Sequence, residues 1–247
     1  MTRSVVGIFG IGLIGGSIGL RARHNGAYVI GSDCDLVALE TARTLGAIDA
    51  VAEGEELHRS ADVLVIATHL EATLDELTRL AQESDLPPAL VLDVSSVKEP
   101  VVRAARRLKN FVATHPMAGS ERSGVSAAHA DLFDDCAWAY VPTGDGALDA
   151  RAEAFIRSCG GMPVAIEAEA HDRMVALTSH IPQIMASRYA DLLRTWEPNA
   201  RQLCGPVARE LLRIADMNPA MWRDILTANA HNIEPPLRRL AYELEKR

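Results

Sequence analysis

One histidine lies in a segment whose composition suits acid–base chemistry. His115 opens the stretch His115–Glu121, which reads HPMAGSE and sets an imidazole beside a proline and a glycine-containing turn. Histidine is the side chain whose ordinary pKa lets it take up or release a proton near neutral pH. A glycine loop typical of dinucleotide sites stands at residues 10–15. Together the two features predict the chemistry of a dehydrogenase, in which a hydride leaves carbon and a proton leaves a nearby oxygen. The alternative is a histidine that only hydrogen-bonds carbonyl groups of its turn.

The glycine loop has the spacing G-x-G-x-x-G. Gly10–Gly15 reads GIGLIG and lies between an expected strand and an expected helix. In such loops the first glycine permits a tight turn, the second lets a pyrophosphate approach, and the third lets helix and strand pack closely. Asp33 ends the next expected strand, where a carboxylate can bind ribose hydroxyls and repels a 2′-phosphate. This predicts NAD rather than NADP, although Arg23 or Arg43 could receive a 2′-phosphate. A turn with an incidental helix-capping aspartate is the alternative.

Composition and charge exclude several classes of protein. With 247 residues, 48% of them hydrophobic, the chain can bury a substantial core in one or two domains. Its net charge of -8 argues against a general nucleic-acid binder. The 4 cysteines are widely spaced without a C-x-x-C pair, which is typical of reduced thiols. Neither a signal peptide nor a membrane span is recognisable. We therefore expect a cytoplasmic protein with a small-molecule substrate, no nucleic-acid partner and no membrane.

Strand-like and helix-like segments alternate over the first two thirds of the chain. Short β-branched or apolar runs predict strands at residues 4–9, 28–32, 61–67, 89–94, 111–114, 138–141 and 162–166. The runs at 61–67 and 89–94 are almost wholly apolar, which is typical of parallel strands covered on both faces. Helical patterns occupy residues 13–23, 35–45, 72–82 and 148–158. Gly46 is expected to end the second of these helices. The strand at 111–114 would deliver His115 at its carboxyl end, the edge of a parallel sheet at which ligands bind.

Helical periodicity alone follows Glu167. Expected helices cover residues 168–193, 207–215, 219–232 and 236–245. Asn218 is an expected N-cap before Pro219 at the first helical position. The predicted fold class is α/β, with an N-terminal Rossmann-type doubly wound sheet followed by an all-α C-terminal domain. The expected domains are residues 1–166, which would bind NAD, and residues 167–247, which would be helical.

The chemistry-bearing segments occur in a recognisable order. They are Gly10–Gly16 (GIGLIGG), Asp93–Lys98 (DVSSVK), His115–Glu121, Ser179–Pro182 (SHIP), Arg213–Ala215 (RIA) and Pro219–Asp224 (PAMWRD). In this order they closely resemble the TyrA family, the prephenate and arogenate dehydrogenases of tyrosine biosynthesis. The resemblance covers nearly the whole chain, and it implies NAD-dependent oxidative decarboxylation of prephenate to 4-hydroxyphenylpyruvate.

The resemblance also implies roles for particular residues. His115 would hydrogen-bond the ring hydroxyl and assist its deprotonation, Ser96 would orient this histidine, and Arg213 would hold the ring carboxylate with its planar guanidinium. The other expected substrate-binding residues are Asp172, Ser179, His180, Gln183, Arg209 and Trp222. The expected cofactor-binding residues are Gly10, Gly12, Leu13, Ile14, Gly15, Asp33, Thr68 and Ser96. No metal ion is expected.

Purely structural interpretations compete with several of these roles. Ser96, with the serine before it, would by itself cap a helix, and Lys98 would be a solvated residue at the start of that helix. Arg209 could equally pair with an acidic neighbour on the surface. His180 by itself would be a core histidine with a satisfied ring, and a buried Trp222 needs no function.

The chain departs from the family pattern at some positions. Many members carry a histidine where this chain has Gln183, near the substrate side chain and the tyrosine inhibitor; glutamine cannot become cationic. The segment Val207–Leu212 is more apolar than in most relatives. The given sequence ends soon after Pro235 and Pro236, and we expect neither a regulatory nor a chorismate mutase domain. The resemblance implies a homodimer through the helical domain, which would also bind substrate, and the short tail weakens the dimer expectation.

Three other functions are compatible with parts of the sequence. Arogenate dehydrogenase, which yields tyrosine, is the nearest of them. Other β-hydroxyacid-type dehydrogenases share the two-domain layout but usually use a catalytic lysine in the helical half, and residues 167–244 contain no lysine. A non-catalytic nucleotide-binding regulator would have no reason to keep His115, Ser96 and Arg213 together.

Overall fold

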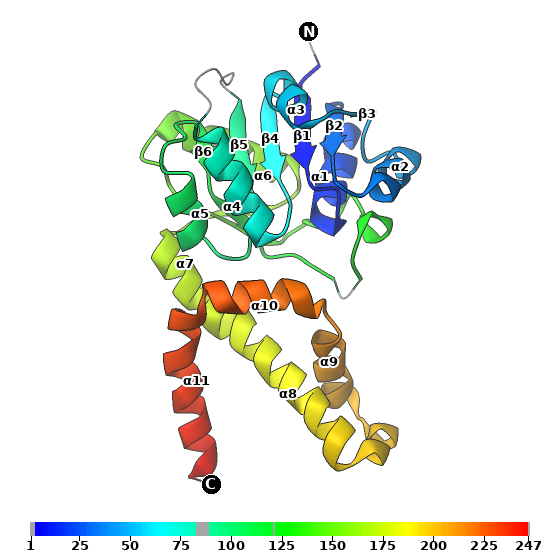
Figure 1. Cartoon of the computed structure of the whole chain (residues 1–247), viewed down its shortest axis with the longest axis vertical. Coiled ribbons are helices and arrows are strands. Elements are labelled where there is room, and N and C mark those ends of the chain that lie inside the picture. The colour runs from blue at the N-terminus through cyan, green and yellow to red at the C-terminus, as the bar shows by residue number, and fades with distance from the viewer. Residues whose placement is uncertain (1–2, 83–88, 121, 247) are drawn as a thin grey trace. The chain divides into compact units, whose positions relative to one another are not determined.

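The chain folds into two compact units, Met1–Ala168 and Glu169–Arg247. The computed structural model describes residues 3–82, 89–120 and 122–246. Figure 1 shows the first unit as a sheet flanked by helices, and the described part of the second unit as helices. Glu121, the last residue of the HPMAGSE segment, lies outside the described residues. Among the described helices, none combines the length and the apolar character needed to cross a membrane.

A six-stranded parallel sheet with the order β3-β2-β1-β4-β5-β6 forms the centre of the first unit. Its strands are β1 (Val5–Phe9), β2 (Tyr28–Ser32), β3 (Ala50–Val51), β4 (Val63–Ile66), β5 (Leu90–Asp93) and β6 (Phe111–Val112). The chain winds outward from β1 in both directions, which is the doubly wound arrangement of Rossmann folds. The predicted fold class is therefore confirmed. Ligands of such sheets bind beyond the carboxyl ends of the strands where the winding reverses, here β1 and β4.

Two layers of helices cover the sheet (Figure 1). One face packs against α1 (Leu13–His24), α2 (Leu36–Leu45) and α6 (Gly146–Ser158), and the other against α3 (Gly54–Ser60), α4 (Leu70–Leu80) and α5 (Glu99–Ala104). Along β5, Leu90 and Leu92 join the first core and Val91 joins the second. Because both faces are buried, the strands are apolar through their centres, as the sequence indicated. Helices α3 and α5 are short; α3 was not predicted, whereas the start of α5 lies where the sequence indicated a helix beginning near Lys98.

A second, three-stranded sheet carries His115. It has the order β7-β8-β9, in which β7 (Thr114–Pro116) is antiparallel to β8 (Ala137–Tyr140) and β8 is parallel to β9 (Met162–Ala165). The expectation of one strand at 111–114 was therefore wrong, because the chain leaves the parallel sheet at Ala113. The backbone N–H and C=O of Thr114 bind the side chains of Asp93 and Lys98. His115 consequently lies opposite Ala139 in β7.

The glycine loop joins β1 to α1 as the motif predicts. Gly10 has φ +99°, a conformation that side chains rarely adopt. A Cβ on Gly15 would overlap the carbonyl oxygen of Gly10, so the third glycine allows the helix to pack on the strand. A Cβ on Gly12 would meet no atom within 4 Å. The first and third glycines are therefore needed for the fold, whereas the second is not.

The helix ends follow the capping signals of the sequence. The Asp35 side chain accepts hydrogen bonds from the N–H groups of Val37 and Ala38, and Gly46 ends α2 in the left-handed conformation with φ +74°. Asn218 caps the helix that begins at Pro219. These local signals are read correctly because they depend on a few neighbouring residues.

The helical unit differs from expectation at two places. Its elements are α7 (Ala168–Val175), a π-helical turn (Ala176–His180), α8 (Ile181–Trp196), a 3-10 helix (Pro198–Leu203), α9 (Pro206–Ala215), α10 (Pro219–Ala228) and α11 (Ala230–Glu245). The helix expected at 168–193 is thus interrupted by the π turn. The break expected between Asn232 and Pro236 lies instead at Asn229, and both Pro235 and Pro236 lie inside α11. The buried side chain of Asn229 explains this position, as described below.

We predict that two glycine substitutions in one loop differ in their effect on stability. Gly15→Ala should lower the free energy of unfolding by about 1–3 kcal/mol, because the added methyl group overlaps a backbone oxygen. Gly12→Ala is the matched control and should change stability by less than about 0.5 kcal/mol. Urea denaturation followed by circular dichroism measures both. Equal stability of the Gly15→Ala variant and the parent would contradict this account of the loop.

Candidate active site

The glycine loop, Asp33 and Thr68 meet at the carboxyl edge of the parallel sheet. The Asp33 carboxylate accepts hydrogen bonds from the N–H groups of Ile11, at 2.6 Å, and Asp35, at 2.8 Å. Asp33 therefore holds the loop in place, and its oxygens keep further lone pairs for another donor. A Cβ on Gly10 would lie 2.8 Å from the Thr68 Cγ2, so Thr68 borders the loop. Leu13 and Ile14 are half-buried in the first turn of α1.

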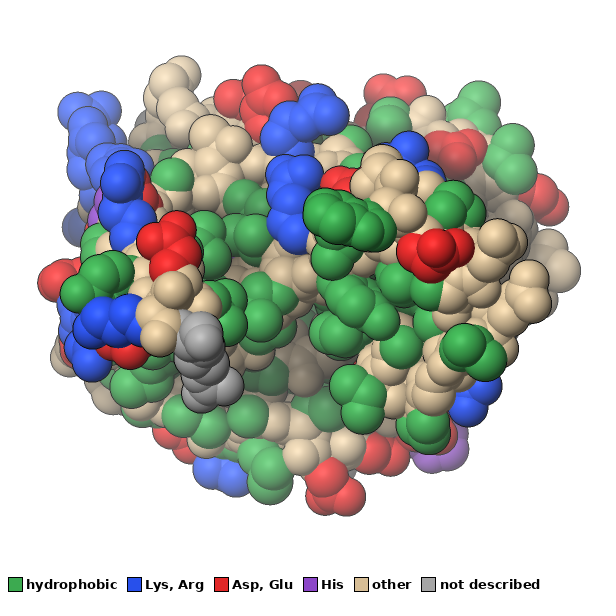
Figure 2. Space-filling model, turned by 90° about the horizontal axis from the view of Figure 1, so that it is seen from below, with side chains coloured by type: hydrophobic (Ala, Val, Ile, Leu, Met, Phe, Trp, Pro, Cys, Tyr) green, Lys and Arg blue, Asp and Glu red, His purple; other side chains and the backbone are tan. Residues whose placement is uncertain are grey.

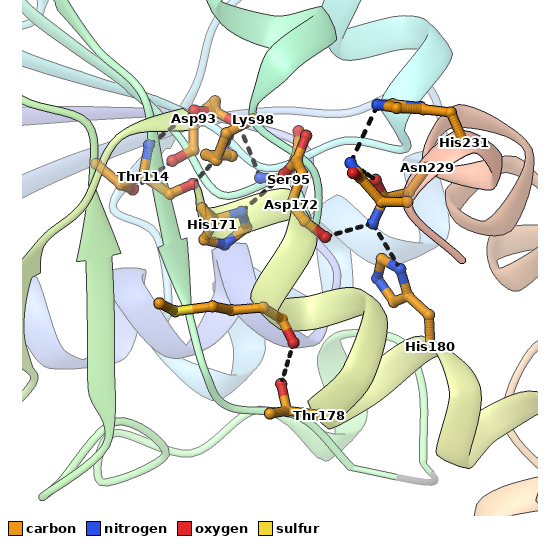
Figure 3. Close-up of polar contacts among 12 residues, drawn as sticks. Asp93, Ser95, Lys98, Thr114, His171, Asp172, Thr178, His180, Asn229 and His231 are labelled. Carbon is orange, nitrogen blue, oxygen red and sulfur yellow. Dashed lines mark hydrogen bonds and ion pairs between the residues drawn. The ribbon is translucent and has the colours of Figure 1, made fainter. Parts of the chain in front are cut away.

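A buried ion pair lies at the end of β5, next to the histidine segment (Figure 3). The Lys98 Nζ is 2.6 Å from the Asp93 Oδ2 and also donates to the carbonyl oxygen of Thr114. The other Asp93 oxygen accepts the N–H of Thr114 at 2.9 Å, and Oδ2 accepts the N–H of Ser95 at 2.9 Å. The Thr114 hydroxyl accepts a hydrogen bond from the Trp138 indole. The interpretation of Lys98 as a solvated residue was wrong, because Lys98 is 0% exposed.

His115 and Ser96 lie one residue beyond this ion-pair network. His115 is 9% exposed, and Ser96 is half-buried in the loop between β5 and α5. Helix α5 begins at Glu99 without a side-chain cap, so neither Ser95 nor Ser96 caps it. The serines are thus not explained as helix caps. The Ser95 hydroxyl is buried and has no hydrogen-bond partner among the described residues.

The helical unit has its own buried polar cluster, drawn in Figure 3. The Asn229 Nδ2 donates to the backbone oxygen of Asp172 at 2.8 Å and lies 3.1 Å from the His180 Nδ1. An amide N–H is a donor only, so the His180 Nδ1 must accept and its ring proton must lie on Nε2. The His171 Nδ1 lies 2.7 Å from the Asp172 carboxylate. Asn229 is 0% exposed, which explains why the chain breaks between helices there.

His180 is neutral in this surrounding. Burial lowers its pKa to about 4; the opposing effect of the Asp172 carboxylate is smaller, and His171 adds to the lowering. The ring also meets Trp222 edge-on, with 6.0 Å between ring centroids. His180 is therefore a neutral hydrogen-bond donor through Nε2. Its partner Asn229 was missed by the sequence interpretation, since nothing in the local pattern marks an asparagine inside a helical run as buried.

Two buried polar atoms of the helical unit lack partners among the described residues. Gln183 is 4% exposed, and its Nε2 donates to the backbone oxygen of Ile214 at 3.1 Å. Its Oε1 is buried without a hydrogen bond, as is the indole Nε1 of Trp222. Because the Ile214 contact fixes the orientation of the amide, Gln183 offers a free acceptor and Trp222 offers a free donor. Ser179, in the π turn, is half-buried.

The two arginines of α9 differ in their contacts. Arg213 pairs with Glu210 through Nη2 at 2.6 Å and Nε at 3.0 Å. The hydrogen bond from Arg213 lowers the pKa of Glu210 below its usual value. The guanidinium is half-exposed, and solvent screening leaves exposed pairs of this kind with little effect on stability. If the carboxylate of a bound ligand replaced Glu210 as the partner of Arg213, the lost pair would therefore cost little free energy. Arg209, for which a surface pair with Glu210 or Asp216 was the alternative to a substrate contact, is exposed and has no ion pair among the described residues.

We predict that His180 stays neutral between pH 5 and pH 8 with its proton on Nε2. Its lowered pKa means that the unfolded chain binds a proton that the folded chain does not, so this group makes stability fall as the pH drops from about 6.5 toward about 4. Nitrogen-15 NMR of the imidazole measures both charge and tautomer. In Asn229→Ala the Nδ1–H tautomer should become populated. A ring that titrates near pH 6.5 in the parent protein would contradict the prediction.

Known proteins resemble both units. The family described as prephenate dehydrogenase, nucleotide-binding domain, matches residues 17–162, and the family described as prephenate dehydrogenase, dimerization domain, matches residues 167–246. The prephenate dehydrogenase of Bacillus subtilis is 34% identical over 91% of this chain and 64% of its own length. The chain spans a little under two thirds of the first curated relatives it matches, at 66% and 64% of their lengths.

Solved structures agree with these matches. The prephenate dehydrogenase of A. aeolicus, in complex with hydroxyphenyl propionate and NAD+, has a TM-score of 0.89 and 26% identity, covering 100% of this chain and 90% of that one. The Synechocystis arogenate dehydrogenase has a TM-score of 0.81 and 25% identity, covering 98% of this chain and 90% of that one. With both of its units matched in order, the chain belongs to the prephenate dehydrogenase family.

Proposed function

We propose that this chain is an NAD-dependent prephenate dehydrogenase that converts prephenate to 4-hydroxyphenylpyruvate. The observation that carries the proposal is the position of His115 one residue beyond a buried ion-pair network, in the unit whose sheet edge also holds the glycine loop and Asp33. Both family matches and the NAD+ complex of the A. aeolicus relative support it. The proposed domains are residues 1–166 for NAD and residues 167–247 for substrate and dimerisation.

The proposed reaction needs one proton acceptor and one carboxylate site. NAD, when bound, accepts the hydride from the ring carbon that bears the hydroxyl group. His115 takes the proton of that hydroxyl while Ser96 orients the imidazole. The ring carboxylate, held by Arg213, leaves as carbon dioxide, and the electron pair of the broken bond completes the aromatic ring. The resulting phenolate oxygen takes the proton back from His115, which gives the phenol of 4-hydroxyphenylpyruvate. The other proposed substrate contacts are Asp172, Ser179, His180, Gln183, Arg209 and Trp222.

The proposed cofactor site uses the glycine loop and the acidic residue after β2. The residues are Gly10, Gly12, Leu13, Ile14, Gly15, Asp33, Thr68 and Ser96. Open space beside the Cα of Gly12 suits the approach of a pyrophosphate to the start of α1. The carboxylate of Asp33 suits the ribose hydroxyls of NAD and would repel the 2′-phosphate of NADP.

Arogenate is a second candidate substrate, favoured by the buried Oε1 of Gln183. The side chain of arogenate carries an ammonium group, whereas that of prephenate carries a keto oxygen. Because the Nε2 of Gln183 is held by Ile214, the amide presents an acceptor that an ammonium group would satisfy and a keto oxygen would not. On this point the two substrates differ by a single hydrogen bond.

A steady-state assay with two substrates and two cofactors tests the proposed function. We expect prephenate oxidation with NAD to exceed that with NADP, and His115→Asn to lower kcat by about 10²–10⁴-fold with an unchanged Kd for NAD. The matched control is His24→Asn, an exposed histidine at the end of α1. Asp33→Asn should raise the Kd for NAD and lower the preference over NADP.

Each arm of this assay has an outcome that contradicts a part of the proposal. A strong preference for arogenate would replace prephenate as the substrate. No NAD reduction with either substrate would refute the dehydrogenase. A His115→Asn variant within a few-fold of the parent would remove His115 from proton transfer, and unchanged selectivity in Asp33→Asn would remove Asp33 from the ribose site.

We propose a homodimer through the helical unit, because large apolar side chains of that unit are exposed. Trp196 is 83% exposed, Leu203 90% and Val207 77%. Figure 2 shows exposed hydrophobic side chains among charged and other polar ones in a view from below that of Figure 1. The family match over residues 167–246 is to a dimerization domain. Exposed apolar clusters of this kind mark association surfaces.

We predict that Trp196→Asp with Leu203→Asp converts the dimer to a monomer, because each change places a charge on the proposed apolar interface. Sedimentation equilibrium at micromolar concentration measures the mass. The matched control is Leu36→Asp in the first unit, which is 77% exposed and should leave the dimer intact. A monomeric parent protein, or a double variant that stays dimeric, would rule out this interface.

A further inference from the structure

The buried Lys98 is the feature of the first unit that the proposed reaction does not itself use. A lysine that is 0% exposed is rare in proteins unless its charge is paired. Its partner Asp93 is also 0% exposed. Two charges taken out of water contribute little to stability, because desolvation offsets their attraction, and apolar residues of similar size can replace such pairs. Stability alone therefore does not account for the pair.

The contacts of the pair are directed to backbone groups of one residue. Lys98 donates to the carbonyl oxygen of Thr114, and Asp93 accepts its N–H at 2.9 Å. The Thr114 hydroxyl in turn donates to the backbone oxygen of Asp93. With both backbone groups bound, the peptide planes on either side of Thr114 have fixed orientations. The next residue is His115, so the direction in which its side chain leaves the backbone is set by this pair.

We propose that the buried Asp93–Lys98 pair positions the catalytic imidazole of His115. The inference rests on the proposed function, in which His115 takes the proton of the ring hydroxyl. Neither charged group touches the substrate; both act through the backbone of Thr114. The pair also holds the N–H of Ser95 at 2.9 Å from the Asp93 Oδ2, which fixes the loop that carries Ser96. One ion pair thus fixes both the loop that carries Ser96 and the start of β7, which carries His115.

A pair that positions a catalytic side chain affects kcat, whereas a pair that only stabilises the fold does not. A displacement of a catalytic group by about 1 Å can cost about 100-fold in rate. Loss of Lys98 should therefore lower kcat, whereas the Kd for NAD, which depends on the glycine loop and Asp33, should stay within about twofold. If the pair only stabilised the fold, its loss would lower the melting temperature and leave kcat of the folded protein unchanged.

The test uses Lys98→Met, which keeps the length of the side chain and removes the charge. The control is Glu76→Gln in α4, which breaks another buried pair of the same unit, between Glu76 and His58 at 2.7 Å. We expect kcat to fall about 100-fold in Lys98→Met and to stay within twofold of the parent in Glu76→Gln, both measured where circular dichroism shows folded protein. In the His115→Asn background, Lys98→Met should lower kcat no further, since its effect passes through His115.

Two outcomes would overturn the inference. One is a folded Lys98→Met variant with kcat within a few-fold of the parent. The other is an equal loss of kcat from Lys98→Met with and without His115. If Lys98→Met does not fold, the neutral combination Asp93→Asn with Lys98→Met leaves no uncompensated buried charge and carries the same expectation for kcat.

A second readout separates this inference from the proposed function. Imidazole NMR signals of His115 in the unliganded protein report the ring's surroundings whether or not the chain turns over any substrate. Lys98→Met should shift or broaden these signals, and Glu76→Gln should leave them unchanged. If the parent oxidises neither prephenate nor arogenate, the proposed function fails, but altered signals still support the positioning. Unchanged His115 signals in folded Lys98→Met would refute it.

Discussion

The ion pair between Asp93 and Lys98 is the constraint on which the candidate active site depends. It lies where β5 ends and where the chain leaves the parallel sheet for a second sheet. By binding both backbone groups of Thr114, it diverts the chain from the ladder it would otherwise continue. A site built on strand ends needs such a device, because the last residues of a strand have no further partner in the sheet. Buried charges supply directional bonds that apolar packing cannot.

The glycine loop allows a close approach of backbone segments at the same sheet edge. Gly10 and Gly15 allow β1 and α1 to meet at a distance that no side chain would permit, and Asp33 holds the loop through the N–H of Ile11. The start of α1 thereby becomes an opening suited to an anion. In the proposed function, this opening binds the cofactor and His115 takes the proton of the ring hydroxyl. The helical unit supplies the neutral His180 and Arg213 as substrate contacts. In that proposal His180 comes from a buried network of the helical unit, whereas Arg213 comes from its surface.

The sequence predicted most of the elements and misjudged those that depend on distant contacts. Strands of the parallel sheet are apolar runs, and Asp35, Gly46 and Asn218 mark helix ends, so local patterns suffice for them. Lys98 was predicted to be solvated because the sequence around a lysine does not show that the carboxylate of Asp93, at the end of β5, pairs with it. The breaks at Ala113 and Asn229 were missed for the same reason. The side chain of Asp93 binds the N–H of Thr114, and the side chain of Asn229 binds the backbone oxygen of Asp172, and both contacts join residues far apart in the chain. The resemblance identified the family, which residue spacing alone would not have done.

The central claim is that His115 of the first unit and Arg213 of the second serve a single six-membered ring. A crystal structure of this chain with NAD and hydroxyphenyl propionate, the ligands named for the A. aeolicus relative, tests it most directly. We expect the phenolic oxygen within hydrogen-bonding distance of the His115 imidazole, the ring beside the nicotinamide, and the Arg213 guanidinium on the same cavity. A ring bound away from His115, or His115 and Arg213 opening onto separate cavities, would contradict it.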